Sequence, residues 1–189
     1  MTMSIEQVFV KQCPKTTALN GGSVFRGATN PLKLADILVV LGYVQHTQPI
    51  GSMVLNAQIA GDTKDRKRLV ATMTDFLHAQ VIPRELAGAL AEAAVHEVCD
   101  TSTCSKCKGT GVTNGKSNQP CSKCEGVGRE TPSERSVVRY VNKHLTTMMM
   151  SRHAYRLRWY PHYMDAIDRL NVEANNAAHA IRRKLREDD

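Results

Sequence analysis

Two identical half-motifs, C-x-x-C-x-G-x-G, contain four of the six cysteines in the chain. Cys104 and Cys107 belong to the first half-motif, and Cys121 and Cys124 belong to the second. The two-residue gap lets a tight turn direct both sulfurs of a pair at one ion, and four thiolates complete a tetrahedral site. The spacing therefore predicts one structural zinc ion (Zn²⁺), because the protein fills every ligand position. The thirteen residues between Cys107 and Cys121 suit a hairpin.

The other cysteines and the nearby histidine are interpreted as structural residues. A thiol–disulfide redox centre is the alternative for this pattern, but it needs one C-x-x-C pair and the chain has two. The glycines after each pair permit positive φ angles, which such a knuckle requires. Cys13 and Cys99 fall outside the pattern, and His96 is interpreted as a helix residue because four cysteines already satisfy the ion.

The positive charge of the chain is concentrated in the cysteine segment and directly after it. The whole chain has a net charge of +7, yet residues 1–100 contain nine basic and nine acidic residues. Residues 101–158 contain eleven basic and three acidic residues, whereas residues 159–189 have a net charge of −1. A local positive field attracts polyanions, among which phosphate backbones are the most common target. A basic surface without a ligand is the alternative.

Two helices are predicted after the cysteine segment, over residues 131–146 and from Ser151 onward. The segment Thr131-Pro132-Ser133-Glu134 contains a cap, a proline in the first turn and an acidic residue. Two such helices form a helix-turn-helix-like module, whose second helix would enter the major groove of DNA. Arginines near its start suit base contacts, for which we expect Arg152 and Arg156. The candidate DNA-binding residues are Arg129, Arg135, Arg139, Lys143, Arg152, His153, Arg156 and Arg158.

The fold class predicted from these patterns is mainly α, a helical bundle body with an inserted four-cysteine zinc ribbon and a C-terminal helix-turn-helix-like module. Residues 1–29 are predicted to be a mobile N-terminal arm. Residues 30–100 form the helical body, residues 101–129 the zinc ribbon, and residues 130–189 the DNA-binding module with a C-terminal helix that packs on the body.

Helix boundaries within the body follow from caps and breakers. A helix is predicted from Asn30-Pro31 to Gly42, and residues 47–61 are predicted to be a loop or only weakly helical. Asp62 is expected to cap a helix over residues 64–82, and a second, alanine-rich helix follows Pro83 and reaches about residue 99. The short connection predicts an antiparallel pair.

The C-terminal region is predicted to be one long amphipathic helix over residues 163–185, with Pro161 kinking or restarting the helix before it. We expect Trp159, Tyr160 and Tyr163 in the core. No run reaches the roughly 18 apolar residues of a membrane span, and the N-terminus is not typical of an export signal. A cytoplasmic protein that does not contact membranes is expected.

The order of these features resembles the late-gene antiterminator Q family of lambdoid phages, in the zinc-containing branch typified by phage lambda. The resemblance is clearest over residues 100–170, in the segments CSKCKGTG, CSKCEGVG, TPSERSVVRYV and SRHAYRLRWYPHYMDAI. The first 100 residues match mainly in layout.

The resemblance implies a transcription antiterminator that binds double-stranded DNA at a late-promoter element. Such a protein loads onto the paused RNA polymerase holoenzyme of the host bacterium near the RNA exit channel, and allows read-through of pauses and terminators. Residues 131–158 would carry DNA binding, residues 1–100 are candidates for the polymerase surface, and nascent RNA is a further candidate partner. The implied location is the cytoplasm of the host bacterium.

Three other classes of protein are alternatives to this interpretation. J-domain cochaperones repeat the same half-motif, but they carry four copies and an HPD tripeptide, whereas this chain has two copies and no HPD. A zinc-dependent DNA- or RNA-binding regulator that does not load onto polymerase would use the same basic residues. An enzyme is disfavoured, because no nucleophile, phosphate loop or open metal site accompanies the candidates Asp75, His78, Glu92 and His96.

Overall fold

The computed structural model describes residues 34–100, 104–108, 110–112, 119–124, 126, 128, 130 and 132–187, and within them the chain is mainly helical, as predicted. The chain divides into two compact units. Unit 1 comprises Met1–Leu69 and Asp168–Asp189, and unit 2 comprises Val70–Ile167. The predicted arm over residues 1–29 and the predicted cap at Asn30-Pro31 lie outside the described residues.

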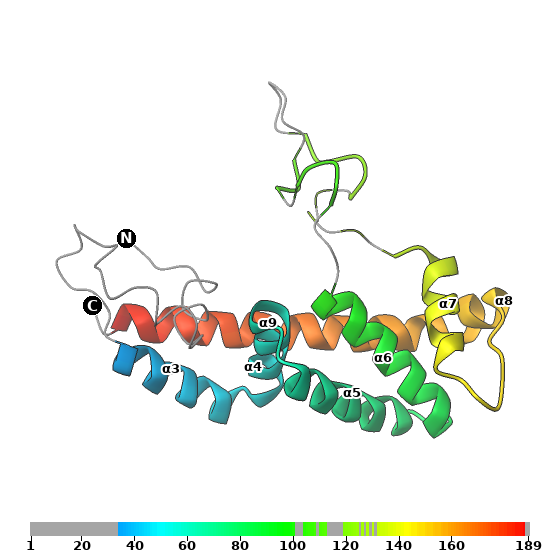
Figure 1. Cartoon of the computed structure of the whole chain (residues 1–189), viewed down its shortest axis with the longest axis horizontal. Coiled ribbons are helices and arrows are strands. Elements are labelled where there is room, and N and C mark those ends of the chain that lie inside the picture. Colours follow the sequence, from blue (N-terminus) through cyan, green and yellow to red (C-terminus); the bar gives the residue numbers. More distant parts are fainter. Residues whose placement is uncertain are drawn as a thin grey trace. The chain divides into compact units, whose positions relative to one another are not determined.

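Unit 1 contains α3 (Leu34–Thr47), α4 (Pro49–Leu55) and the π-helical turn η1 (Asn56–Ala60). The start of α5 (Thr63–His78) and the end of α9 (Tyr160–Glu187) complete it (Figure 1). Its core is apolar, with the α3 positions spaced three and four residues apart, as one buried helix face requires. The buried side chains include Ile37, Val40, Leu41, Val44, Val54, Leu55, Leu69, Leu170, Ile181 and Leu185.

The predicted end of the first helix at Gly42 was wrong. α3 continues through the exposed Gly42 to Thr47, because a glycine inside a helix costs only about 1 kcal/mol and the buried residues on either side of it, Leu41 and Val44, keep the helix packed. Of the two alternatives predicted for residues 47–61, a loop or a weak helix, the structure has helix, and Pro49 occupies the first turn of α4, where a proline is compatible with helix. Gly61 then ends η1 in the left-handed conformation with φ +66°.

A close approach of backbones in unit 1 depends on Gly51. A Cβ at Gly51 would lie 2.0 Å from the carbonyl oxygen of Glu173 and 2.7 Å from the Cβ of Ala177. Only glycine therefore allows α4 to lie this close to α9. Sequence alone gives no reason to single out this glycine, since its partner lies more than 120 residues away along the chain.

The start of α5 has the cap that the sequence predicts. Asp62 Oδ1 accepts hydrogen bonds from the backbone N–H groups of Lys64 (2.7 Å) and Asp65 (3.2 Å). These bonds lower the pKa of the Asp62 carboxyl, the bond from Asp65 having the largest effect. α5 ends at His78 and not near residue 82, because Val81 has a φ of +65° and interrupts the helical conformation.

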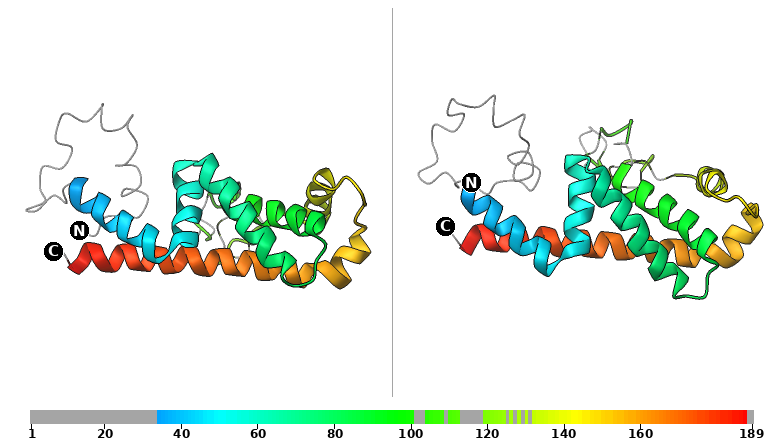
Figure 2. Two further views of the ribbon diagram at one scale, coloured as in Figure 1. Left: turned by 90° about the horizontal axis from the view of Figure 1, so that it is seen from below. Right: turned by 60° about the horizontal axis from the view of Figure 1, so that its bottom comes forward.

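Unit 2 contains the remainder of α5, α6 (Arg84–Asp100), α7 (Glu134–Lys143), α8 (Arg152–Ala154), the π-helical turn η2 (Tyr155–Trp159) and the start of α9. The two views of Figure 2 show α5 and α6 side by side and antiparallel, which confirms the predicted pair. The buried side chains of α6 are Leu86, Ala87, Ala89, Leu90, Ala91, Ala93, Ala94, Val95 and Val98.

The chain remains helical through Pro161, and α9 begins at Tyr160, directly before this proline. In η2 the backbone N–H of Tyr160 donates to the carbonyl of Tyr155, five residues earlier, and this wider turn precedes the proline. Tyr163 is buried as expected, whereas Tyr160 is exposed and Trp159 only half-buried. Among the described helices, none is both long and apolar enough to cross a bilayer.

Candidate metal centre and candidate nucleic-acid interface

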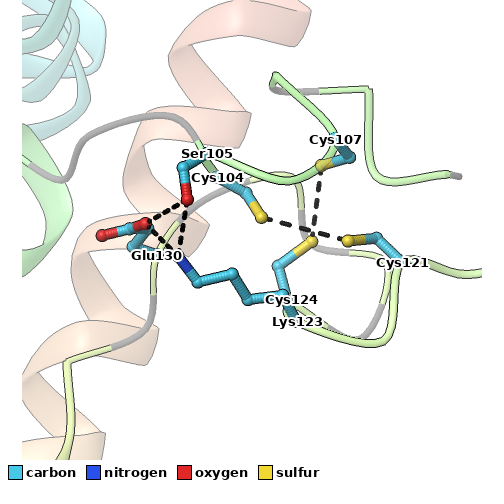
Figure 3. A network of polar contacts seen from close by, with 7 residues as sticks. All are labelled: Cys104, Ser105, Cys107, Cys121, Lys123, Cys124 and Glu130. Atoms are coloured by element: carbon cyan, nitrogen blue, oxygen red, sulfur yellow. Dashed lines mark hydrogen bonds and ion pairs between the residues drawn. The ribbon is translucent and has the colours of Figure 1, made fainter.

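The four predicted ligands come together in one buried cluster (Figure 3). The Sγ atoms of Cys104 and Cys121 are 3.9 Å apart, and those of Cys107 and Cys124 are 3.7 Å apart. All four sulfurs lie within 4.8 Å of one another. Metal–sulfur bonds of about 2.3 Å place the sulfurs of a tetrahedral site about 3.8 Å apart. The cluster could therefore hold one metal ion with four thiolate ligands.

Two equivalent backbone hydrogen bonds join the two half-motifs, one in each direction. The N–H of Cys104 donates to the carbonyl of Gly128 (2.9 Å), and the N–H of Cys121 donates to the carbonyl of Gly111 (2.8 Å). In each case the first cysteine of one half-motif bonds to the last glycine of the other. The sequence repeat is therefore also a structural repeat, in which each half closes the other.

A lysine of each half-motif also bonds to a serine of the other half-motif. Lys106 Nζ donates to Ser122 Oγ, and Lys123 Nζ donates to Ser105 Oγ, each at 2.6 Å. Lys123 also bonds to Glu130 Oε1 at 2.6 Å (Figure 3), and this bond raises the pKa of Lys123 and lowers that of Glu130. These two lysines connect the two half-motifs to each other.

A glycine allows the two half-motifs to close on each other. Gly111 has a φ of +73°, and a Cβ at this position would lie 2.3 Å from the carbonyl oxygen of Gly126. An antiparallel bridge between Val112 and Pro120 lies at the base of the connection, where the spacing predicts a hairpin. Residues 113–118 lie outside the described residues.

Burial of the thiols opposes their ionisation unless a cation is present. Burial raises the pKa of Cys124 to about 11, although the N–H of Gly128 donates to its sulfur at 3.2 Å. The pKa of Cys121 is lowered, mainly by a hydrogen bond from the backbone N–H of Lys123. Buried thiolates need positive charge, so the donor set itself is suited to a metal cation.

The first helix after the cysteines presents a basic face. Ser133 caps α7 by accepting a hydrogen bond from the N–H of Ser136 at 3.3 Å, so the helix begins at Glu134 and is shorter than the predicted 131–146. Its inner positions are buried and its outer positions exposed. The buried set is Val137, Val138 and Val141, and the exposed set is Arg135, Arg139 and Lys143. Within the described part of the chain, these three cations form no ion pair.

The second predicted helix begins as expected. Ser151 Oγ accepts a hydrogen bond from the N–H of Ala154 at 3.1 Å and caps α8. Arg152 and His153 follow this cap and are exposed. The guanidinium of Arg158 lies 5.0 Å from the ring centre of Trp159, in a cation–π contact.

Arg156, for which we expected a base contact, is bonded to α7. Its Nε and one terminal nitrogen donate to Glu134 Oε2 at 3.2 and 2.8 Å. The ion pair fixes η2 relative to the start of α7. Arg129, a further candidate, lies outside the described residues.

Two residues that sequence reasoning missed hold the connection between α7 and α8. Glu85, at the start of α6, accepts hydrogen bonds from the N–H and hydroxyl groups of both Thr146 and Thr147. Asn142 bonds to both backbone groups of Met150, at 2.8 and 2.9 Å. The first interaction joins residues 61 apart, so no local pattern in the sequence indicates it.

The residues considered for catalysis have structural partners. The ring of His96 stacks on Tyr140 with 4.5 Å between ring centres, and its Nδ1 lies 2.9 Å from Asp100 Oδ2. His78 Nδ1 lies 2.8 Å from the carbonyl oxygen of Ile82. Asp75 pairs with Arg84 at 3.4 Å.

Fold and site together define a mainly helical protein with a four-cysteine centre that can bind a metal ion. The chain belongs to the family described as conserved hypothetical protein CHP02642, whose model matches residues 2–103 and 99–189. The two matched segments together include both half-motifs and the helices on either side of them. No curated protein matches the chain.

Proposed function

We propose that the protein is a phage transcription antiterminator. It binds a late-promoter element in double-stranded DNA, loads onto the paused RNA polymerase holoenzyme of the host bacterium, and allows read-through of pauses and terminators. The observation that carries the proposal is the exposed basic face of α7 next to the capped start of α8, directly after the metal centre. This order of parts resembles that of the lambdoid antiterminator Q family. The protein acts by binding and not as an enzyme.

The metal ion of the centre is zinc in this proposal. A tetrahedral set of four sulfurs suits zinc or an iron–sulfur site. A closed site with no ligand position left for substrate is typical of structural zinc. When bound, zinc supplies a cross-link between the two half-motifs, and Cys104, Cys107, Cys121 and Cys124 hold it. The symmetrical hydrogen bonds around the cysteines suit this structural role.

DNA binding is assigned to α7 and to the helix that begins at α8, as in a helix-turn-helix. Arg135, Arg139 and Lys143 lie four residues apart on α7, so they present one face to a phosphate backbone. Arg152 and His153, at the start of the second helix, are placed for groove contacts. The connection between the two helices donates hydrogen bonds to Glu85 at the start of α6.

The polymerase-binding surface is assigned to the first 100 residues. On α3 the described residues Leu38, Val39 and Tyr43 are large apolar side chains exposed to solvent. Exposed apolar groups close together suit a protein partner better than a nucleic acid. Nascent RNA near the exit channel is a further partner of the basic region.

A selection of random duplex DNA by the intact, zinc-loaded protein tests the proposal. We expect enrichment of one sequence, lost when a chelator removes the metal, and then read-through of a terminator by bacterial polymerase on a template carrying that sequence. Enrichment without read-through would leave a zinc-dependent DNA-binding regulator that does not load onto polymerase. Failure to enrich any sequence at moderate salt would contradict the proposed function.

The arginines of α7 offer a second test with a matched control. Arg139→Ala should weaken binding about equally for all DNA sequences and reduce the slope of log affinity against log salt by about 1, because one phosphate contact is lost. Arg182→Ala removes the same charge from an exposed position of α9 and should leave the slope unchanged. Equal slopes for the two variants would remove Arg139 from the interface.

A further inference from the structure

Leu157 is a large apolar side chain in the middle of the basic segment. It lies between Arg156 and Arg158 in η2, and 69% of it is exposed. Tyr155, two residues earlier, is fully buried, so the two side chains lie on opposite sides of the helix. Leu157 therefore points away from the core of unit 2.

The neighbours of Leu157 divide into anchored and exposed residues. Arg156 is held by Glu134 through two hydrogen bonds, and Arg158 lies over the ring of Trp159. His153 lies four residues before Leu157, about one turn of helix, and is exposed. Leu157 is therefore an exposed apolar side chain among exposed cationic ones, of which Arg156 is paired with Glu134.

We propose that Leu157 is a specificity-determining residue that contacts the 5-methyl group of a thymine in the major groove of the bound DNA. The inference rests on the proposed DNA-binding function. The thymine methyl is the apolar group that base pairs present in the major groove, and aliphatic or aromatic side chains recognise it by contact. A leucine on a basic helix face has this partner within a polyanionic ligand, where phosphates and sugars offer no comparable apolar group.

Arg156 acts as a positioning residue in this arrangement. Its ion pair with Glu134 ties η2 to the first turn of α7, so the reading helix keeps its rotation relative to the phosphate-binding helix. The residues that contact base pairs in the major groove are then His153 and Leu157, together with Arg152 at the start of the helix.

Replacement of thymine by uracil tests the contact directly, because it removes only the methyl group. The full-length, zinc-loaded protein is measured on the duplex that it selects from a random pool, with each thymine replaced in turn. We expect one position at which uracil weakens binding about fourfold, the effect of one buried methyl group at ~0.8 kcal/mol. Leu157→Ala should weaken binding to the thymine duplex and show no further loss at that uracil.

Val172→Ala is the matched control, since it shortens another exposed apolar side chain, on α9. It should retain the full uracil effect. Sequence-selective binding with no uracil-sensitive position, or with an unchanged uracil effect in Leu157→Ala, would overturn this inference and leave the proposed function intact. If no duplex is selected at all, the proposed function fails and the inference fails with it.

Discussion

The four-cysteine segment and the helical units are held together by different interactions. In the cysteine segment the buried residues that cluster are the four cysteines themselves, and the half-motifs are joined by backbone and lysine hydrogen bonds. In the helical units, leucine, isoleucine, valine and alanine side chains form the core. With the proposed zinc bound, the first region would depend on one ion, whereas the second depends on many small apolar contacts. Single changes should affect the two regions separately.

The largest effect is expected from loss of a ligand. Cys121→Ser should release zinc and unfold the cysteine segment, because the binding free energy of structural zinc, about 10–16 kcal/mol in zinc-finger peptides, is also its folding free energy. The helical signal in circular dichroism should be nearly unchanged. Cys99→Ser, which changes a half-buried cysteine outside the cluster, should retain one zinc per chain. Full zinc retention in Cys121→Ser, measured by metal analysis, would disprove the site.

The converse change destabilises unit 1 and should leave zinc binding unchanged. Gly51→Ala places a Cβ against the carbonyl of Glu173 and should destabilise the protein by about 1–3 kcal/mol, the usual effect of overpacking. Gly42→Ala makes the same change in α3 with nothing within 4 Å, so it should stabilise by about 0.5–1 kcal/mol. Denaturant unfolding measures both values, and zinc content should stay at one per chain. Equal effects of the two substitutions would contradict the close approach.

The same contrast explains which parts could be predicted from sequence. The metal centre depends on local spacing, and Asp62 and Ser151 act within a few residues of themselves, so these features were predictable. For Pro49–Leu55 the sequence leaves a loop and a weak helix open, because the backbone of α9 that lies against Gly51 is far away along the chain. The partners of Glu85 and Arg156 come from distant segments, which spacing does not indicate.

The smallest effect is expected at the connection between α7 and α8. Hydrogen bonds lower the pKa of Glu85 from 4.5 to about 2, and the bond from the Thr147 hydroxyl has the largest effect. A carboxyl with a lowered pKa stabilises the folded state fully above its unfolded value of 4.5, and this contribution is lost as the pH falls through about 2. As the pH falls from 4.5 to about 2, the advantage in thermal stability of the wild type over Glu85→Gln should therefore decrease.

Asp168→Asn, which neutralises an exposed carboxyl on α9, separates this effect from a general change in charge. If the difference in thermal stability from wild type disappears over the same pH range and by the same amount in both variants, the hydrogen bonds of Glu85 with Thr146 and Thr147 add nothing to stability. If only Glu85→Gln shows the pH-dependent loss of its difference from wild type, the next measurement is the DNA affinity of this variant near neutral pH. A variant that keeps its zinc but binds the selected duplex more weakly would show that the connection positions the two helices for DNA, and that the helical unit and the metal centre contribute separately to binding.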